Sequence, residues 1–171
     1  MNEKWDRHFI GLAEYHSRMS KDPSTKIGAV IVGPDKEVLS AGFNGFPRGI
    51  ADTEERLNNR DMKLKLVVHA EMNAILAAAR TGIKLKGSTL YVIALNRSYR
   101  IWGGPPCTRC AVEIIQAGII EIVSFKPQYR SIPKAWKADL DFSREVLSEA
   151  GVLYREVDYE RERTAGSSEE V

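Results

Sequence analysis

Two short motifs that lie far apart in the sequence constrain the fold of this chain more than any other feature. The first is His69-Ala70-Glu71, and the second is Pro106-Cys107-Thr108-Arg109-Cys110. One imidazole and two thiols are three protein ligands, the number that a catalytic zinc takes when its fourth tetrahedral position stays open for water. Glu71 stands two residues from the imidazole, where a carboxylate can carry protons beside the metal without being a ligand. A fold that uses this set must bring the two motifs together around one ion.

Composition places the chain among ordinary soluble globular proteins. Its 171 residues are 43% hydrophobic and 28% charged, which is enough for one domain with a buried core. The formal net charge of +2 is close to balance. A general polyanion binder would carry a concentrated basic face, so nucleic acid is not the expected partner.

The cysteines and the first residues of the chain indicate the cellular compartment in which we expect the protein. Cys107 and Cys110 are the two cysteines, and their C-x-x-C spacing places them on one helical turn rather than across a disulfide-bonded fold. The charged start of the chain contains no apolar signal-peptide segment, and no apolar run approaches the ~20 residues that span a bilayer. We therefore expect a cytoplasmic protein without a membrane segment, in which a C-x-x-C pair serves metal or redox chemistry.

Hydrophobic periodicity predicts helices and strands that alternate along most of the chain. Helices are expected over residues 2–19, 71–80, 107–117 and 141–150, and strands over 27–32, 38–43, 89–95, 119–125 and 152–157. The charged segment 52–65 is expected to hold a helical turn or two. Residues 44–49 and 96–104 are predicted to be loops, residues 126–138 a long connection, and residues 160–171 a frayed tail.

This order of elements predicts an α/β fold. Gly33-Pro34-Asp35-Lys36 has the turn chemistry of an antiparallel hairpin, whereas the later strands are separated by helices and call for parallel pairing with right-handed crossovers. The expected architecture is a three-layer α/β/α sandwich with a mixed five-stranded sheet. We expect residues 1–159 to form a single domain and residues 160–171 to be a disordered tail.

The predicted architecture also brings the two motifs together. His69-Ala70-Glu71 lies at the start of one predicted helix and Cys107 at the start of the next, and both helices follow strands. Their N-termini are therefore expected at the carboxyl edge of the sheet, where ligand crevices form in open α/β folds. The positive ends of the two helices favour thiolates, the form of cysteine that binds a metal.

Taken alone, each motif could serve a role other than a catalytic zinc site, and the rest of the sequence bears on each of these alternatives. A C-x-x-C pair in a cytoplasmic chain can be a redox site, but thiol redox chemistry does not explain His69. A structural zinc normally has a fourth protein ligand. The remaining histidines, His8 and His16, lie on the first predicted helix, where packing or surface roles are expected.

Several motifs together resemble one family of zinc-dependent enzymes. The pair H-x-E and P-C-x-x-C is a signature of nucleobase deaminases. From about residue 5 to about residue 125 the chain resembles the deoxycytidylate deaminase family, within the cytidine deaminase-like fold. The segments that carry the resemblance are Asp22-Pro23-Ser24-Thr25-Lys26-Ile27-Gly28-Ala29-Val30, Gly42-Phe43-Asn44-Gly45-Phe46-Pro47-Arg48-Gly49, Val68-His69-Ala70-Glu71-Met72-Asn73-Ala74-Ile75 and the Pro-Cys-x-x-Cys turn.

The resemblance implies a reaction and a set of roles. The reaction is the hydrolytic deamination of deoxycytidylate to deoxyuridylate and ammonia, which supplies the precursor for thymidylate synthesis. His69, Cys107 and Cys110 would hold one Zn²⁺, and Glu71 would move the protons. Asn44 corresponds to a residue that hydrogen-bonds the sugar, and the backbone of Ala70 to one that contacts the base.

The family also suggests partners that no motif in the chain identifies. Its members are often homo-oligomers, and deoxynucleoside triphosphates with Mg²⁺ often regulate them. Two features of this chain depart from the usual family pattern. The segment 96–104 lengthens the path from the strand to the Pro-Cys turn, and the absence of a spare cysteine argues against a second, structural zinc.

The substrate is the open question at this point. A site that requires a nucleotide should present basic groups to its phosphate, and the candidates are Lys26, Arg48, Arg97 and Arg100. The alternatives are a deaminase of another nucleobase, a nucleoside or transfer-RNA adenosine, and a non-catalytic zinc-binding module. Near-neutral charge argues against the RNA substrate, and Glu71 argues against a purely structural site.

Overall fold

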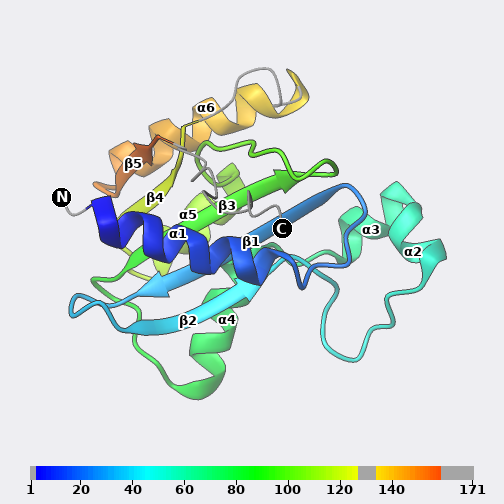
Figure 1. Ribbon diagram of the computed structural model, residues 1–171, viewed down its shortest axis with the longest axis horizontal. Coiled ribbons are helices and arrows are strands. Elements are labelled where there is room, and N and C mark those ends of the chain that lie inside the picture. Colours follow the sequence, from blue (N-terminus) through cyan, green and yellow to red (C-terminus); the bar gives the residue numbers. More distant parts are fainter. Residues whose placement is uncertain (1–2, 127–133, 159–171) are drawn as a thin grey trace, which may run out of the picture.

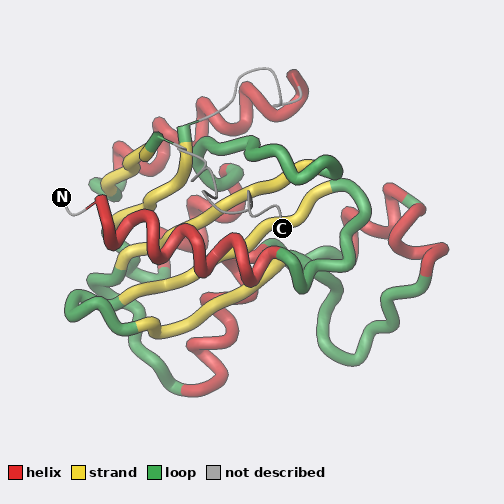
Figure 2. The backbone as a smooth tube through the Cα atoms, viewed as in Figure 1, coloured by secondary structure: helices red, strands yellow, loops and turns green. Residues whose placement is uncertain are grey.

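The computed structural model describes residues 3–126 and 134–158. Figure 2 shows helices and strands following one another along most of this chain. The helices are α1 (Glu3–Ser17), α2 (Glu54–Asn58), α3 (Arg60–Leu66), α4 (Ala70–Thr81), α5 (Thr108–Gln116) and α6 (Lys134–Glu149). The strands are β1 (Thr25–Val32), β2 (Val38–Phe43), β3 (Thr89–Asn96), β4 (Glu121–Phe125) and β5 (Leu153–Val157).

The five strands form one mixed sheet in the order β2-β1-β3-β4-β5 (Figure 1). β1 pairs antiparallel with both β2 and β3, and Thr25 at the start of β1 lies opposite Asn96 at the end of β3. β4 pairs parallel with β3 and with β5. One edge of the sheet therefore carries the start of β1 and the ends of β2, β3 and β4. The predicted mixed five-stranded sheet is confirmed.

Helices cover both faces of this sheet. Side chains alternate along β1, so that Val30 and Val32 pack with Phe9 and Ile10 of α1, while Ala29 packs against the opposite layer. That opposite layer contains buried residues of α4, α5 and α6, among them Ala74, Ile114 and Leu147. Figure 1 shows α1 crossing in front of the sheet and α4 behind it. This arrangement is the predicted α/β/α sandwich.

Two glycines allow helices to approach the sheet closely. A Cβ atom on Gly28 of β1 would lie 1.8 Å from the carbonyl oxygen of Ala13 in α1. A Cβ atom on Gly42 of β2 would lie 2.4 Å from the carbonyl oxygen of Ala70, at the start of α4. Because real Cβ atoms do not come so close, only glycine fits at these positions. The second contact fixes the first turn of α4 against the sheet, next to His69.

One region differs from the sequence-based expectation, whereas the charged segment 52–65 agrees with it. The predicted connection 126–138 is wrong for residues 134–138, because α6 begins at Lys134 and continues through the predicted start at residue 141. Its opening residues, Lys-Ala-Trp-Lys-Ala, favour a helix except for the tryptophan. The segment 52–65 forms two short helices, whose first turns are capped by the side chains of Thr53 and Asn59.

Two other expectations concern the ends of the chain and the membrane. The predicted tail, residues 160–171, lies outside the described residues. Across residues 3–126 and 134–158, every helix is too short or too polar to cross a membrane.

Candidate active site

The two motifs meet at the N-termini of α4 and α5. His69 is the N-cap residue of α4 and Cys107 is the N-cap residue of α5, and both have extended backbone conformations. An N-cap side chain usually accepts a hydrogen bond from the first turn of its helix, but neither residue does so here. Both side chains are therefore free to face each other. Cys110 joins them from the first turn of α5.

The three predicted ligands lie at distances that fit a tetrahedral metal ion. His69 Nδ1 lies 3.4 Å from Cys107 Sγ and 3.3 Å from Cys110 Sγ. All three candidate ligand atoms lie within 4.8 Å of one another. Zinc bonds of about 2.0–2.3 Å at tetrahedral angles separate neighbouring ligand atoms by about 3.5–3.8 Å. A zinc ion therefore fits among them after small shifts, with no fourth protein ligand in this group.

The pKa values of the three candidate ligands reflect how close together their side chains lie. Hydrogen bonding from Cys110 lowers the pKa of the Cys107 thiol to about 4. Hydrogen bonding to Cys107 raises the pKa of His69 to about 9. The pKa of Cys110 is raised, first by its hydrogen bond to Cys107 and then by burial. A bound divalent cation would favour the thiolate form of both sulfurs.

Glu71 is buried directly beside this ligand set. Its side chain is 3% exposed, and its Oε2 atom has no hydrogen-bond partner among the described residues. Burial raises the pKa of this carboxyl group, while the charge of His69 lowers it. A buried carboxylate oxygen without a partner is costly, so its presence indicates a partner that binds there during function. An acid or base that exchanges protons with a bound molecule has this arrangement.

A cleft opens over the ligand set and Glu71. Its floor includes Ile27 of β1 and Val92 and Ala94 of β3, and its apolar walls include Leu64, Pro105, Trp136 and Leu140. The cleft thus lies at the sheet edge that carries the start of β1 and the end of β3. An apolar cleft with a few polar groups converging in it is the usual form of a small-molecule site.

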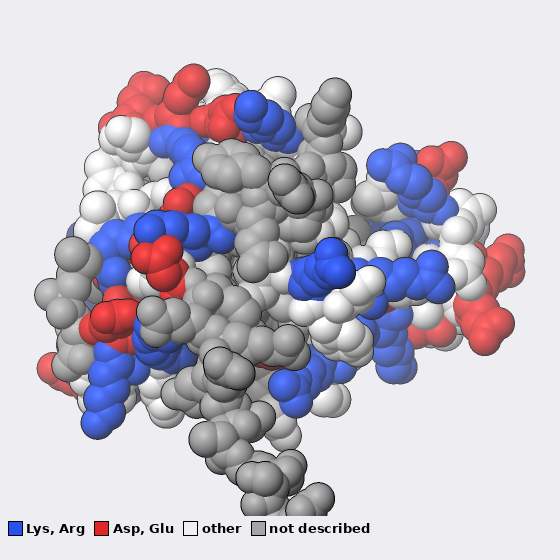
Figure 3. Space-filling model, turned by 45° about the horizontal axis from the view of Figure 1, so that its top comes forward, with Lys and Arg blue, Asp and Glu red and all other residues white. Residues whose placement is uncertain are grey.

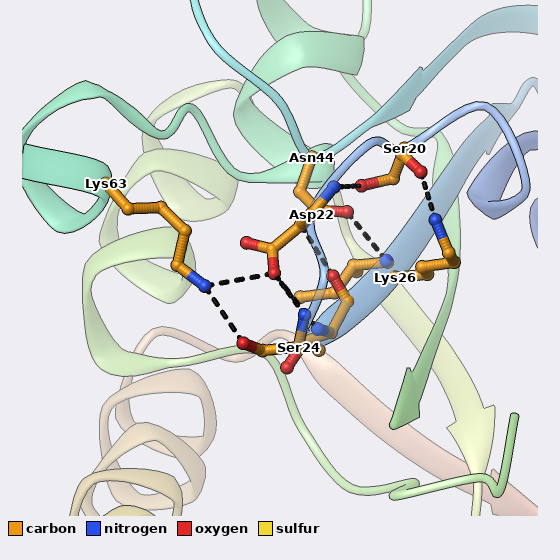
Figure 4. Close-up of polar contacts among 8 residues, drawn as sticks. Ser20, Asp22, Ser24, Lys26, Asn44 and Lys63 are labelled. Atoms are coloured by element: carbon orange, nitrogen blue, oxygen red, sulfur yellow. Dashed lines mark hydrogen bonds and ion pairs between the residues drawn. The ribbon is translucent and has the colours of Figure 1, made fainter. Parts of the chain in front are cut away.

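One cationic side chain enters this cleft from α3. Lys63 Nζ lies 3.0 Å from Asp22 Oδ1 and 3.1 Å from Ser24 Oγ (Figure 4). Asp22 Oδ1 also accepts hydrogen bonds from the backbone N–H groups of Ser24 and Thr25, which fixes the turn that leads into β1. The Lys63 side chain is only 12% exposed. Its ammonium is therefore held in place at the cleft rather than free in solvent.

Asn44 lies at the same side of the cleft and is 3% exposed. Its Oδ1 atom accepts a hydrogen bond from the backbone N–H of Ile27 at 2.8 Å, and its Nδ2 atom donates one to the carbonyl oxygen of Thr25 at 2.9 Å. These bonds attach the loop after β2 to β1. Each atom can form one further hydrogen bond, so the amide can also bind a ligand.

Comparison with known proteins places this site in a family. Residues 3–126 match the cytidine and deoxycytidylate deaminase zinc-binding region. The chain belongs to this family. The chain is 36% identical to an uncharacterised deaminase from Aliivibrio fischeri over 152 residues, which are 89% of this chain and 92% of the relative. It is 34% identical to human deoxycytidylate deaminase over 159 residues, covering 89% of this chain and 79% of the human protein.

A solved structure shares the fold of this deaminase. The deoxycytidylate deaminase of cyanophage S-TIM5 in its apo form superimposes with a TM-score of 0.66 at 23% identity, covering 92% of this chain and 100% of that one. The same phage enzyme in complex with dCMP and dUMP gives a TM-score of 0.65 at 24% identity. The resemblance inferred from the motifs is confirmed at the level of family and fold.

The predicted substrate-binding residues of the deaminase lie in different surroundings. Ala70 is fully buried between His69 and Glu71, which both line the cleft. Lys26 is not among the lining residues, and its Nζ donates a hydrogen bond to the carbonyl oxygen of Ser20. Arg48, Arg97 and Arg100 are exposed and are likewise absent from the lining of this cleft.

Lys63, Trp102 and Trp136 line the cleft, although the sequence alone did not single them out as site residues. Lys63 stands six residues before His69 in a segment rich in charge, and no periodicity distinguished it from its neighbours. The one local signal was Asn59, an N-cap residue that indicates a helix beginning at Arg60 and therefore containing Lys63. Trp102 lies in the lengthened loop, where a large aromatic residue close to Cys107 could have been noted.

Proposed function

We propose that this chain hydrolyses deoxycytidylate to deoxyuridylate and ammonia, which supplies the precursor for thymidylate synthesis. The observation that carries the proposal is the buried, unpartnered Oε2 atom of Glu71 beside His69, Cys107 and Cys110 in one apolar cleft. A structural metal site gains nothing from such a carboxylate, whereas a hydrolytic site needs a proton carrier there. Relatives that are named deoxycytidylate deaminases support the choice of substrate.

His69, Cys107 and Cys110 would hold the zinc ion through Nδ1 and the two Sγ atoms. When bound, zinc is a Lewis acid that makes water a stronger acid and so a better nucleophile near neutral pH. Glu71 Oε2 takes a proton from the attacking water and passes it to the adjacent ring nitrogen of the base. Glu71 then takes the second proton and delivers it to the amino group, which leaves as ammonia. The carbon–nitrogen bond breaks and a carbonyl group takes its place.

The Lys63 ammonium in the cleft could bind the 5′-phosphate of a nucleotide. Lys63 Nζ has three donors, and Asp22 and Ser24 engage two of them. The third can serve a phosphate oxygen, and the exposed hydroxyl of Ser24 lies within reach of the same anion. Asp22 is satisfied by Lys63 and two backbone N–H groups, which limits its repulsion of a phosphate. Asn44, on the same side of the cleft, is proposed to bind the sugar.

Kinetics with a nucleotide and its nucleoside test this assignment. We expect kcat/KM for deoxycytidylate to exceed that for deoxycytidine at least ~10-fold at fixed ionic strength, the equivalent of one charge-assisted contact. Lys63→Met should reduce the nucleotide value and spare the nucleoside value. Lys65→Met, an exposed position on the same helix, is the matched control, and Arg48→Ala and Arg100→Ala test the basic residues named from the sequence. Equal efficiencies in the unmodified protein would refute the nucleotide assignment and leave the deaminase chemistry in place.

A transfer-RNA substrate is the alternative that the sequence left open, and the formal net charge of +2 argues against it. On the face drawn in Figure 3, both Lys and Arg side chains and Asp and Glu side chains are exposed. A salt-dependent RNA-binding assay separates the two substrates, because phosphate contacts give a steep dependence on salt. A homo-oligomer, regulation by deoxynucleoside triphosphates with Mg²⁺, and a cytoplasmic location remain predictions.

A further inference from the structure

The indole of Trp102 carries a second unsatisfied polar atom at the active-site cleft. Among the described residues, two buried side-chain nitrogen or oxygen atoms have no hydrogen-bond partner, Glu71 Oε2 and Trp102 Nε1. Both residues line the same cleft. The proposed proton transfers use Glu71 and leave Trp102 without a role. An indole N–H can only donate, so the missing partner of Trp102 is an acceptor.

The backbone around Trp102 is held at both ends. Its N–H donates to the carbonyl oxygen of Ala94 at 2.9 Å, and a bridge pairs Ile101 with Leu95, so the segment folds back along β3. Ile101 is 4% exposed and belongs to the core on the α1 face. The position of the tryptophan is therefore set by the sheet and not by a free loop.

The two glycines after Trp102 fix the other end. Gly104 N–H donates to the carbonyl oxygen of Phe125 at the end of β4, at 3.0 Å. Gly103 has a φ of 62°, and a Cβ atom there would lie 2.5 Å from that same carbonyl oxygen. Only glycine fits such a position, and it brings the Trp-Gly-Gly segment directly over the end of β4. The lengthened loop thus delivers one large side chain to the cleft in a fixed place.

We propose that Trp102 is a specificity-determining residue whose indole N–H donates a hydrogen bond to an oxygen of the bound pyrimidine nucleotide. The inference rests on the proposed function. The acceptor is an oxygen of the nucleoside part or of the phosphate, and Trp102 reaches it from a segment that lengthens the usual path to the Pro-Cys turn. Its ring adds to the apolar wall that Trp136 and Leu140 form from α6. A ligand oxygen would then satisfy a donor that is otherwise buried and unpaired.

Binding of the product separates this role from catalysis. Trp102→Phe keeps an aromatic ring and removes the N–H, so we expect its Kd for deoxyuridylate, measured by calorimetry, to rise about fivefold. Trp5→Phe is the matched control, because Trp5 stacks on Phe9 of α1 and does not line the cleft. Its Kd should equal that of the unmodified protein. A parallel titration with deoxyuridine locates the acceptor: an equal loss for both ligands places it on the nucleoside, and a loss for the nucleotide alone places it on the phosphate.

Fluorescence gives a second measurement that does not depend on the Trp102→Phe variant folding. The chain has three tryptophans, so the double variant Trp5→Phe, Trp136→Phe leaves Trp102 as the single emitter. We expect its emission to change on addition of deoxyuridylate. The inference is overturned if Trp102→Phe binds with an unchanged Kd, or if the Trp102 emission does not respond at saturating ligand. Failure of the unmodified protein to bind any pyrimidine nucleotide would instead refute the proposed function.

Discussion

Cys110 Sγ lies 3.3 Å from His69 Nδ1, although 41 positions separate the two residues in the sequence. This proximity is produced by the fold, because the two side chains lie at the N-termini of different helices, and both N-termini lie at one edge of the sheet. The helices are placed by close packing, such as that of Ala70 on Gly42. The chemistry of the site therefore depends on contacts well outside it.

Glu71→Gln should keep zinc and lose turnover. The substitution preserves the size of the side chain and removes its ability to accept and return a proton. General acid–base steps contribute about 10²–10⁴-fold, so kcat should fall by at least that range when one residue serves more than one transfer. Metal analysis and steady-state kinetics on the same preparation decide the point. A variant that lost its zinc would identify Glu71 as a ligand, and near-normal turnover would remove it from the mechanism.

Cys110→Ser should lower both metal content and stability. The thiolate is one of the three proposed protein ligands, and the free energy of zinc binding is in part free energy of folding. We expect substoichiometric zinc and a lower melting temperature that no longer responds to a chelator. Thiol titration with and without reductant provides the contrast with redox chemistry. A freshly purified, zinc-free protein that forms and reduces a Cys107–Cys110 disulfide would contradict the metal assignment.

Gly28→Ala should destabilise the fold without touching the site. The new methyl group would lie 1.8 Å from the carbonyl oxygen of Ala13, so α1 must move away from the sheet. Overpacking of this kind costs about 1–3 kcal/mol, and a contact with backbone belongs at the upper end. Gly11→Ala on α1 is the matched control, since no atom lies within 4 Å of its Cβ position and alanine favours a helix by about 0.5–1 kcal/mol. Urea unfolding of both variants should give free-energy changes of opposite sign.

The sequence predicted the sheet and brought forward a candidate ligand set because each had a local signal. The H-x-E and P-C-x-x-C spacings reflect the geometry of a metal site, and the alternation of strands with helices reflects the layers. The basic residue of the cleft, Lys63, had no such signal. Lys26 and Lys63 are both lysines near the β1 edge, yet Lys26 bonds Ser20 while Lys63 reaches Asp22 from a helix far along the chain. Which of the two lysines lies in the cleft depends on contacts between residues far apart in the sequence. Hydrophobic periodicity gives no information on such contacts.

The early start of α6 has a similar cause. Residues 134–138 carry no helical apolar stripe, and Ala135, Trp136, Lys137 and Ala138 are all exposed. The helix is instead fixed at the next residue, where Asp139 accepts a hydrogen bond from Thr108 N–H at 3.1 Å, beside Cys107. Only the tertiary contact reveals that α6 contributes Trp136 and Leu140 to the cleft.

Arg155→Met should destabilise the fold through a buried charge. Arg155 of β5 forms two hydrogen bonds to the carboxylate of Asp6 in α1, at 2.9 and 3.1 Å, and a third to Glu121 at 2.6 Å. The Asp6 side chain is 6% exposed and also accepts a hydrogen bond from Tyr91. Methionine would keep the apolar contacts and leave the Asp6 carboxylate buried with one neutral donor. Loss of one partner of a buried pair costs about 3–5 kcal/mol, and we expect the lower end because the Arg155 side chain is 15% exposed.

An exposed ion pair provides the comparison for that substitution. Lys126 Nζ lies 2.8 Å from Asp158, but the two side chains are 57% and 68% exposed. Solvent and salt screen such a pair, so Lys126→Met should change the free energy of unfolding by less than about 1 kcal/mol. Denaturant unfolding of both variants, with zinc content held stoichiometric, measures the difference. If Arg155→Met proved as mild as Lys126→Met, the contact between α1 and β5 would not be a determinant of stability, and the carboxylate of Asp6 would have to find water or a proton in its place.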